Sequence, residues 1–313
     1  MTEPLRSGAP PSGVPSVVVV GAASRDLAPD DLRGWRLGGG VTYAALTTAR
    51  LGLQTAALIG VDRDAAEAAE LSLLRDAGVN VRLVPLAHGP VFDNVETPDG
   101  RRQFAFDRSD PVSVDALPAA WRRASAWILA PVAGELSEEW ADALPSEAII
   151  ALGWQGLLRD LAAGAPVRQM RPGPSRLLAR ADLVGLSRDD VDPSIGLDEL
   201  SRLLRPGATL VLTQGDRGGI VLEAGDRARN LRRYRAVPSV QPVDPTGAGD
   251  AFLAGLLVAR TQPKLVGGRI GQGFDLLLAA AVASLVAEGP GLDGVPDRSA
   301  IRRRMSEGLA AGR

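Results

Sequence analysis

The sequence predicts an α/β protein in which helices cover a central, mostly parallel sheet. Short apolar runs alternate with helical stretches along most of the chain, beginning with four consecutive valines at 17–20. Apolar runs that leave no polar face are typical of strands buried on both sides. With 313 residues, 45% of them hydrophobic, the chain can bury a sizeable core, either as one large α/β domain or as one domain with a small appendage.

The N-terminal third follows a β-α-β-α-β order, which indicates parallel strands joined by crossover helices. Gly52 and Gly78 are expected to end the two helices. The glycines at 38–40 precede the first helix, either where backbone approaches a ligand or as a flexible connector. The expected elements are strands at 16–20, 55–59 and 79–84 and helices at 43–51 and 65–77.

Residues 91–107 interrupt this order. Two alternating segments flank a Pro-Asp-Gly turn there, which predicts a β-hairpin. A hairpin inserted in this way is either a flap over a site or an antiparallel edge of the main sheet.

Alternation then resumes, and a polar or glycine-containing turn follows each strand. Parallel strands end at one edge of a sheet, so the turns at 153–159, 187–190 and 213–215 are expected near Asp26, which follows the first strand. Asp26 itself is either a ligand-binding residue or an ordinary loop or cap residue. The strands expected in this part are 126–129, 149–152, 183–186, 210–213, 218–223 and 231–237, and the helices are 251–260, 274–287 and 298–308.

Composition excludes several classes of protein. There is no cysteine, so disulfides and thiol catalysis are ruled out, and with only one histidine, His88, a Ser-His-Asp triad is not expected. A net charge of −2 with scattered arginines predicts no nucleic-acid surface. Residues 1–15 are expected to be a disordered tail rather than a signal peptide, and no apolar run is long enough to span a membrane. We therefore expect a cytoplasmic protein.

Residues 243–257, V-D-P-T-G-A-G-D-A-F-L-A-G-L-L, join a turn, a glycine-rich segment and the start of an apolar helix. Unpaired N–H groups at a helix N-terminus bind anions such as phosphate. Asp250, in the first helical turn, is either a partner of the helix dipole or a base that accepts a proton from an attacking hydroxyl. A carboxylate beside a phosphate site favours the second interpretation, because it otherwise repels the anion.

The segment D-P-T-G-A-G-D-A-F-L-A-G closely resembles the second signature of the ribokinase-like (PfkB) carbohydrate kinases. G-G-G-V-T-Y-A-A-L-T-T-A-R-L-G is similar to the N-terminal signature of that family, and A-D-L-V-G-L-S-R-D-D and V-L-T-Q-G-D-R-G-G-I match it in order. P-V-A-G-E at 131–135 and W-Q-G-L-L-R at 154–159 resemble a branch that includes inositol kinases. The resemblance implies a ribokinase-like three-layer fold at 16–297 with a small, reduced β lid at 91–107, followed by a surface helix and tail at 298–313.

The resemblance also implies an activity: a kinase, a monomer or homodimer, that uses ATP and Mg²⁺ to phosphorylate a hydroxyl of a small sugar, polyol or cyclitol. A monovalent cation is left open as a further cofactor. Asp250 would be the catalytic base. The remaining roles carried over are Gly247, Ala248 and Gly249 as the anion hole, Asp26, Gly38, Gly39 and Tyr43 as substrate contacts, Thr213, Gly215, Arg159 and Ser187 as nucleotide contacts, and Asp190 as a magnesium ligand through water.

The chain departs from the family at two positions. Tyr43 stands where a substrate-binding Asn is usual, and Ser187-x-x-Asp190 stands where Asn-x-x-Glu is usual. A nucleoside kinase of the same fold and a ligand-binding member with little catalysis therefore stay open as alternatives. A dinucleotide-dependent oxidoreductase is dropped, because G-A-A-S-R-D after the first strand lacks the later glycines of G-x-G-x-x-G. A Walker-type NTPase is dropped, because G-x-x-x-x-G-K-[ST] does not occur.

Overall fold

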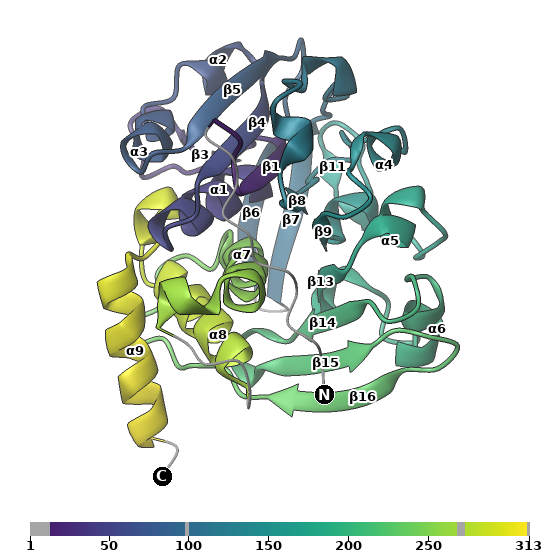
Figure 1. Cartoon of the computed structure of the whole chain (residues 1–313). Helices are drawn as coiled ribbons and strands as arrows, with labels where there is room; N and C mark the ends of the chain where they lie inside the picture. Colours follow the sequence, from purple (N-terminus) through teal and green to yellow (C-terminus); the bar gives the residue numbers. More distant parts are fainter. Residues whose placement is uncertain (1–12, 98–99, 268–272, 312–313) are drawn as a thin grey trace.

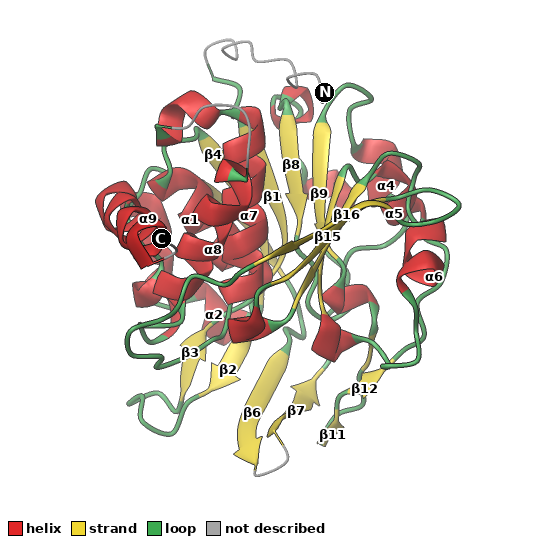
Figure 2. Cartoon of the chain, turned by 90° about the horizontal axis from the view of Figure 1, so that it is seen from below, coloured by secondary structure: helices red, strands yellow, loops and turns green. Residues whose placement is uncertain are grey.

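A nine-stranded sheet runs through the centre of the protein, with helices on both faces (Figures 1 and 2). The structure, a computed structural model, describes residues 13–97, 100–267 and 273–311. The strand order is β16-β15-β14-β13-β9-β8-β1-β4-β5. The seven strands from β14 to β5 in this order are parallel, whereas β15 pairs antiparallel with both β14 and β16. The predicted fold class and strands are confirmed. The strands are β1 (Val17–Ala22), β4 (Thr55–Val61), β5 (Asn80–Pro85), β8 (Ala126–Leu129), β9 (Ile149–Gly153), β13 (Leu183–Ser187), β14 (Thr209–Thr213), β15 (Gly219–Glu223) and β16 (Arg229–Tyr234).

The valine run of β1 is explained by burial on both faces. Val17 and Val19 pack in one apolar cluster, and Val18 and Val20 pack in the cluster on the opposite face. Since alternate side chains of a strand point to opposite faces, no position of β1 is left for a polar residue. The first cluster is covered by α1 (Gly40–Arg50), α3 (Glu70–Asp76), α7 (Ala248–Thr261), α8 (Phe274–Val286) and α9 (Arg298–Ala311), and the second by α4 (Trp140–Ala143), α5 (Arg176–Arg180) and α6 (Leu197–Arg202).

The helix expected at 65–77 is wrong as a single element. It is divided into α2 (Arg63–Ala66) and α3. Glu70 begins α3, and its carboxylate accepts the N–H of Leu37 (3.1 Å) and pairs with Arg33 (2.5 Å). These contacts tie the start of α3 to a distant segment, which helical periodicity does not reveal.

The hairpin at 91–107 is confirmed as β6 (Val91–Thr97) and β7 (Gly100–Asp107), with residues 98–99 of its turn outside the described residues. It belongs to a second sheet, in the order β11-β7-β6-β2-β3, that lies beyond one end of the main sheet (Figure 2). This sheet is larger than the expected hairpin. Its three further strands have only two or three residues each, too few to produce a recognisable pattern. They are β2 (Arg25–Leu27), β3 (Trp35–Leu37) and β11 (Ala165–Pro166), and a separate pair is formed by β10 (Arg159–Asp160) and β12 (Arg168–Gln169).

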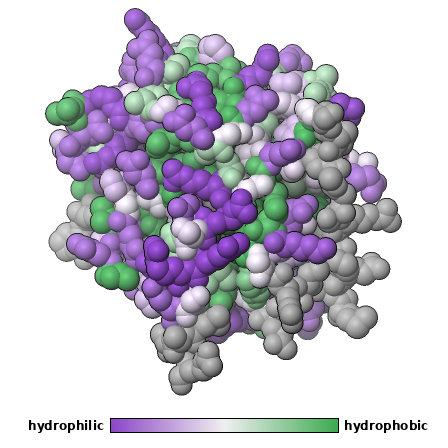
Figure 3. Space-filling model, turned by 60° about the vertical axis from the view of Figure 1, so that its left-hand side comes forward, coloured by the Kyte–Doolittle hydropathy of each residue, from purple (hydrophilic) through white to green (hydrophobic). Residues whose placement is uncertain are grey.

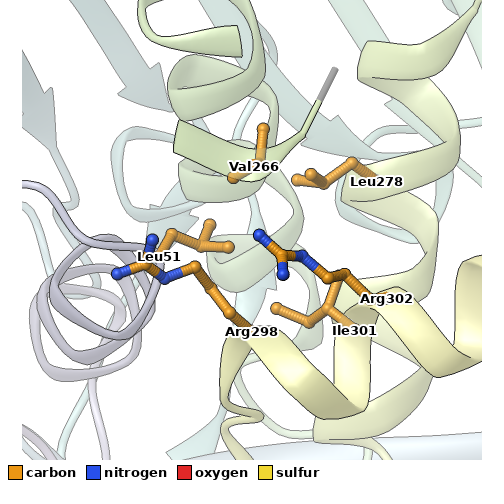
Figure 4. A pocket seen from close by; sticks show the side chains of 6 residues that line it. All are labelled: Leu51, Val266, Leu278, Arg298, Ile301 and Arg302. Carbon is orange, nitrogen blue, oxygen red and sulfur yellow. The ribbon is translucent and has the colours of Figure 1, made fainter. Parts of the chain in front are cut away.

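The C-terminal helix α9 is amphipathic, as expected. Ile301 packs towards Leu51 and Leu278 (Figure 4). The guanidinium of Arg298 lies over Gly52, where an added Cβ would be 2.8 Å from Nη2. Hydrophilic side chains cover much of the surface on this side of the molecule (Figure 3).

Two further expectations concern the N-terminal tail and membrane-spanning segments. Most of the expected disordered tail, residues 1–12, lies outside the described residues. Within the described part of the chain, no helix is long and apolar enough to cross a membrane.

Candidate active site

The glycine-rich turn begins α7 at Ala248, close to the expected position, with Gly247 as its N-cap. Gly247 has a left-handed φ of 76°, and an added Cβ would lie 2.2 Å from Cγ of Tyr43. Both the backbone angle and this contact therefore require glycine. A Cβ on Gly249 would meet no atom within 4 Å, so the turn faces open space there. A helix N-terminus that opens onto free space is a site for an anion.

Ala248 and Tyr43 are less available for contact with a ligand than the roles implied by the resemblance require. The N–H of Ala248 donates to the Pro245 carbonyl (3.1 Å), so this amide of the expected anion hole is already engaged within the turn. Tyr43 is 1% exposed and packs against Gly247. It supports the turn from within the core, and its role as a substrate contact stays a prediction that this burial does not favour.

Asp250 lies in the first turn of α7, half-buried, where a second helix N-terminus approaches it. A Cβ on Gly40, the first residue of α1, would be 2.5 Å from Oδ1 of Asp250. Burial raises the pKa of Asp250 to about 6, with Arg159 opposing this and Asp190 and Asp26 adding to it. A carboxylate whose pKa lies near neutrality is suited to accept a proton. A carboxylate that only pairs with the helix dipole does not need such a pKa.

Arg159 provides the positive charge near Asp250. It lies on β10, after the short turn that follows the end of β9 at Gly153, as expected. Its guanidinium carbon is 5.3 Å from the ring centroid of Phe92, and Nη1 donates to the Val132 carbonyl (3.1 Å). Burial lowers the pKa of Arg159, and Asp190, Asp250 and Asp26 oppose that effect. An arginine stays protonated under such opposing influences, so the site holds a fixed cation among carboxylates.

Asp26 and the three glycines at 38–40 come together as the sequence predicts. Asp26 lies on β2, and its Oδ1 accepts the hydroxyl of Ser24 (2.8 Å). A Cβ on Gly38 would be 2.1 Å from Oδ2 of Asp26, and Gly39 is the N-cap of α1 with a φ of 95°. The glycines therefore mark close approaches to the two carboxylates and are not a flexible connector.

Ser187 and Asp190 form a capping box at the end of β13. Asp190 accepts the N–H of Ser187 (3.1 Å) and Nε2 of Gln155 (2.8 Å), and the Ser187 hydroxyl accepts the N–H of Asp189 (3.3 Å). Burial raises the pKa of Asp190. Among the residues that the structure describes, no group of three or more acidic or histidine side chains is arranged to hold a metal. The role of Asp190 as a magnesium ligand through water stays a prediction.

Thr213 and Gly215 lie on the same edge of the main sheet, at the end of β14. The Thr213 hydroxyl donates to the Leu186 carbonyl of the neighbouring strand (3.4 Å), and Gly215 is exposed with a φ of 58°. Their position matches the expected shared edge, whereas their nucleotide contacts stay a prediction.

Sequence reasoning missed Glu135. This side chain is 1% exposed and accepts the N–H groups of Ala22 (2.8 Å) and Ala133 (2.8 Å), while both its oxygens face the N–H of Val132. Burial raises its pKa, and the hydrogen bonds oppose that effect. Glu135 thus fixes the loop whose Val132 carbonyl holds Arg159. The P-V-A-G-E segment was the only signal, and it gave no role.

A family model described as pfkB family carbohydrate kinase matches residues 14–297. The chain belongs to this family. It is therefore a phosphotransferase of the carbohydrate kinase type, as its signatures indicated. No curated protein matches the sequence.

Solved structures with the same fold span nearly the whole chain. A pyrophosphate-dependent kinase in the ribokinase family, complexed with a pyrophosphate analog and myo-inositol, is 22% identical with a TM-score of 0.71, covering 92% of this chain and 99% of that one. Ribokinase from Arabidopsis thaliana, complexed with ribose and ATP, is 20% identical with a TM-score of 0.63 (93% and 99%). A nucleoside kinase from Methanocaldococcus jannaschii is 15% identical with a TM-score of 0.64 (94% and 100%). At these identities the likeness shows the ribokinase-like fold.

Proposed function

We propose that this kinase transfers a phosphoryl group from ATP to a hydroxyl of a small sugar, polyol or cyclitol, with Asp250 as the general base. The observation that carries the proposal is the position of this carboxylate. It combines a pKa of about 6 with a place in the first turn of a helix that opens onto free space at Gly249. A base at the edge of an anion site suits a hydroxyl that attacks phosphorus.

The other residues then take complementary roles. The N-terminus of α7 and the Arg159 guanidinium stabilise the negative charge of the phosphoryl group during transfer. Asp26 accepts hydrogen bonds from acceptor hydroxyls and orients the one that faces Asp250. Thr213 and Gly215, with Ser187, bind the nucleotide. Magnesium, when bound, neutralises phosphate charge, and Asp190 would hold it through water.

The aromatic side chains favour a polyhydroxy acceptor over a nucleoside. Tyr43 and Phe92 are the two aromatic residues that the sequence places at the expected acceptor site. Tyr43 is 1% exposed, and Phe92 is 2% exposed beneath the guanidinium of Arg159. Neither ring is available for stacking on a nucleobase. The nucleoside kinase alternative therefore has less support.

The second sheet is proposed as the lid over the acceptor, since it carries Asp26 on β2 and Phe92 on β6. We also propose that residues 16–297 form the kinase domain and that the protein is a cytoplasmic monomer or homodimer. A monovalent cation is left open as a further cofactor. A ligand-binding protein with little catalysis is the remaining alternative.

The test is a panel of phosphoryl-transfer reactions with the full-length protein and Mg²⁺. Pentoses, hexoses, inositols and nucleosides are offered with ATP, and separately with pyrophosphate, and products are identified by phosphorus NMR. We expect a phosphomonoester from at least one sugar or cyclitol, formed about 10² to 10⁴ times more slowly by Asp250→Asn. Binding without any product from the whole panel would indicate the ligand-binding alternative instead.

A further inference from the structure

The loop that leads into the glycine-rich turn is held mainly by hydrogen bonds. This connecting loop, residues 236–246, runs from the end of β16 to Gly247, the N-cap of α7. It contains three prolines, which have no N–H to donate. Val237 is buried near its start, whereas Val240 and Val243 are 82% and 58% exposed and do not anchor it. The position of the turn therefore depends on what the remaining polar groups of the loop contact.

Several of these contacts are made with the C-terminal end of α8, where the final carbonyls have no partner within the helix. The N–H groups of Val243 and Asp244 both donate to the Ala287 carbonyl (2.7 and 3.1 Å). The Ser239 hydroxyl donates to the Ser284 carbonyl (3.0 Å). The connecting loop thus follows the end of α8, and a displacement of one displaces the other.

A largely buried ion pair joins the connecting loop to α9, which packs along α8 (Figure 1). The side chain of Arg304 on α9 is 10% exposed, and its Nη2 pairs with Oε2 of Glu288 (2.7 Å). Its Nη1 donates to the Pro238 carbonyl (3.3 Å) and to the Ser284 hydroxyl (2.5 Å). The other carboxylate oxygen of Glu288 accepts the N–H of Val240 (2.5 Å). One arginine and one glutamate therefore fix the middle of the loop against two helices.

Stability alone does not explain this ion pair. Moving two charges out of water costs free energy that their attraction often does not offset, and apolar side chains of similar size stabilise a fold as well or better. Packing of α9 is already provided by Ile301 and Met305, which are buried in the same apolar cluster as α7 and α8. What Arg304 adds is a set of hydrogen bonds with fixed directions, made to the loop and to its anchor on α8.

We propose that Arg304, together with Glu288, is a positioning residue for phosphoryl transfer. The pair fixes the connecting loop, and through it the N–H groups at the start of α7 that face the transferred phosphoryl group. This inference rests on the proposed function, and it adds α9, which begins at Arg298, to the elements that determine turnover. The loop comes from β16, on the side of the sheet that carries the proposed nucleotide contacts, so the effect should fall on the phosphate donor.

The experiment compares wild type with Arg304→Met, Glu288→Met and the double variant, because Met keeps the length of the side chain and removes its charge. Arg180→Met is the matched control, since Arg180 also donates to three backbone carbonyls but lies on α5, on the opposite face of the sheet. Arg303→Met is the exposed control on α9. Measurements are kcat, the KM of ATP and of the acceptor, the melting temperature, and amide hydrogen exchange of residues 239–247 without ligand.

In Arg304→Met, kcat/KM for the donor should fall about 10- to 100-fold, because a small displacement of a positioned group has an effect of this size. The KM of the acceptor should stay the same, and residues 239–247 should exchange faster. Arg180→Met should lower the melting temperature without changing either KM or this exchange. Arg303→Met should change none of these quantities.

The double variant separates positioning from stability. It leaves no unpaired buried charge, so its melting temperature should return towards that of wild type. Its kcat/KM for the donor should nevertheless stay low, because the loop still lacks its hydrogen bonds. Recovery of both quantities in the double variant overturns the inference, and so does an equal loss of donor kcat/KM in Arg180→Met.

The two proposals fail in distinguishable ways. If wild type forms no phosphomonoester, the kinase proposal fails, and hydrogen exchange still tests whether the ion pair holds the connecting loop. Faster exchange of residues 239–247 in Arg304→Met and in the double variant, but not in Arg180→Met, supports the pair. Unchanged exchange in a folded Arg304→Met protein contradicts it, whatever the activity.

Discussion

The pH dependence of turnover follows directly from the environment of Asp250. Burial raises the pKa of this carboxyl from the ordinary 3.8 to about 6. A base works only when ionised, and a group with a pKa of about 6 is about 99% ionised at pH 8 but about 9% ionised at pH 5. Turnover should therefore fall roughly tenfold from pH 8 to pH 5. An ordinary Asp would still be more than about 90% ionised at pH 5, and the rate would hardly change.

The neighbouring charges predict how this profile moves in variants. The negative charge of Asp190 helps to raise the pKa of Asp250, and the positive charge of Arg159 lowers it. Asp190→Asn should move the acidic limb to lower pH, and Arg159→Gln should move it to higher pH. These opposite shifts distinguish Asp250 from titration of the donor phosphate, which is the same in every protein compared.

The assay is kcat from initial rates between pH 5 and 9, at saturating donor, acceptor and Mg²⁺ and constant ionic strength. A profile that is flat from pH 5 to 8 in wild type would refute the reasoning. So would acidic limbs that move in the same direction in both variants.

Substitutions at Arg159, Glu135 and Gly247 test the surroundings of the base. Arg159→Ala should lower kcat at least about 100-fold, and Arg159→Lys should restore only part of it because the planar fork of donors is lost, as steady-state kinetics at pH 8 would show. Glu135→Gln should destabilise the fold by about 1–3 kcal/mol in urea unfolding, since the amide N–H₂ of Gln would face a backbone N–H. Gly247→Ala should cost about 2–4 kcal/mol because it combines a left-handed φ with overlap on the buried Tyr43 ring, whereas Gly249→Ala, which faces open space, should leave unfolding almost unchanged. Equal unfolding midpoints for the two alanine variants would contradict the packing argument.

Sequence patterns predicted the fold well where burial is regular. The four valines of β1 indicated a strand covered on both faces because neither face tolerates a polar side chain, and both clusters are present. The glycine-rich turn likewise predicted the start of α7, since glycine and proline limit the backbone directly. The break between α2 and α3 was not predictable, because it depends on Glu70 contacting Arg33 and Leu37 from another part of the chain.

The candidate site was predictable to the extent that it lies at strand ends. Asp26, Arg159 and Asp250 follow different strands or begin a helix, and the parallel order of the sheet brings them to one edge. Their mutual effects on pKa require three-dimensional distances, which spacing in sequence does not provide. Short strands such as β2 and β11 carry no periodicity, so the size of the second sheet was missed. Glu135 was missed for a different reason: its role consists of hydrogen bonds to backbone groups, which no sequence pattern reveals.

The most direct test of Asp250 as the base is Asp250→Asn, which keeps the size of the side chain and removes its basicity. Turnover on an identified acceptor should fall by about 10² to 10⁴. Thermal stabilisation by acceptor and by ATP should persist, because neither ligand depends on the proton transfer for binding. Full turnover in Asp250→Asn would contradict the account.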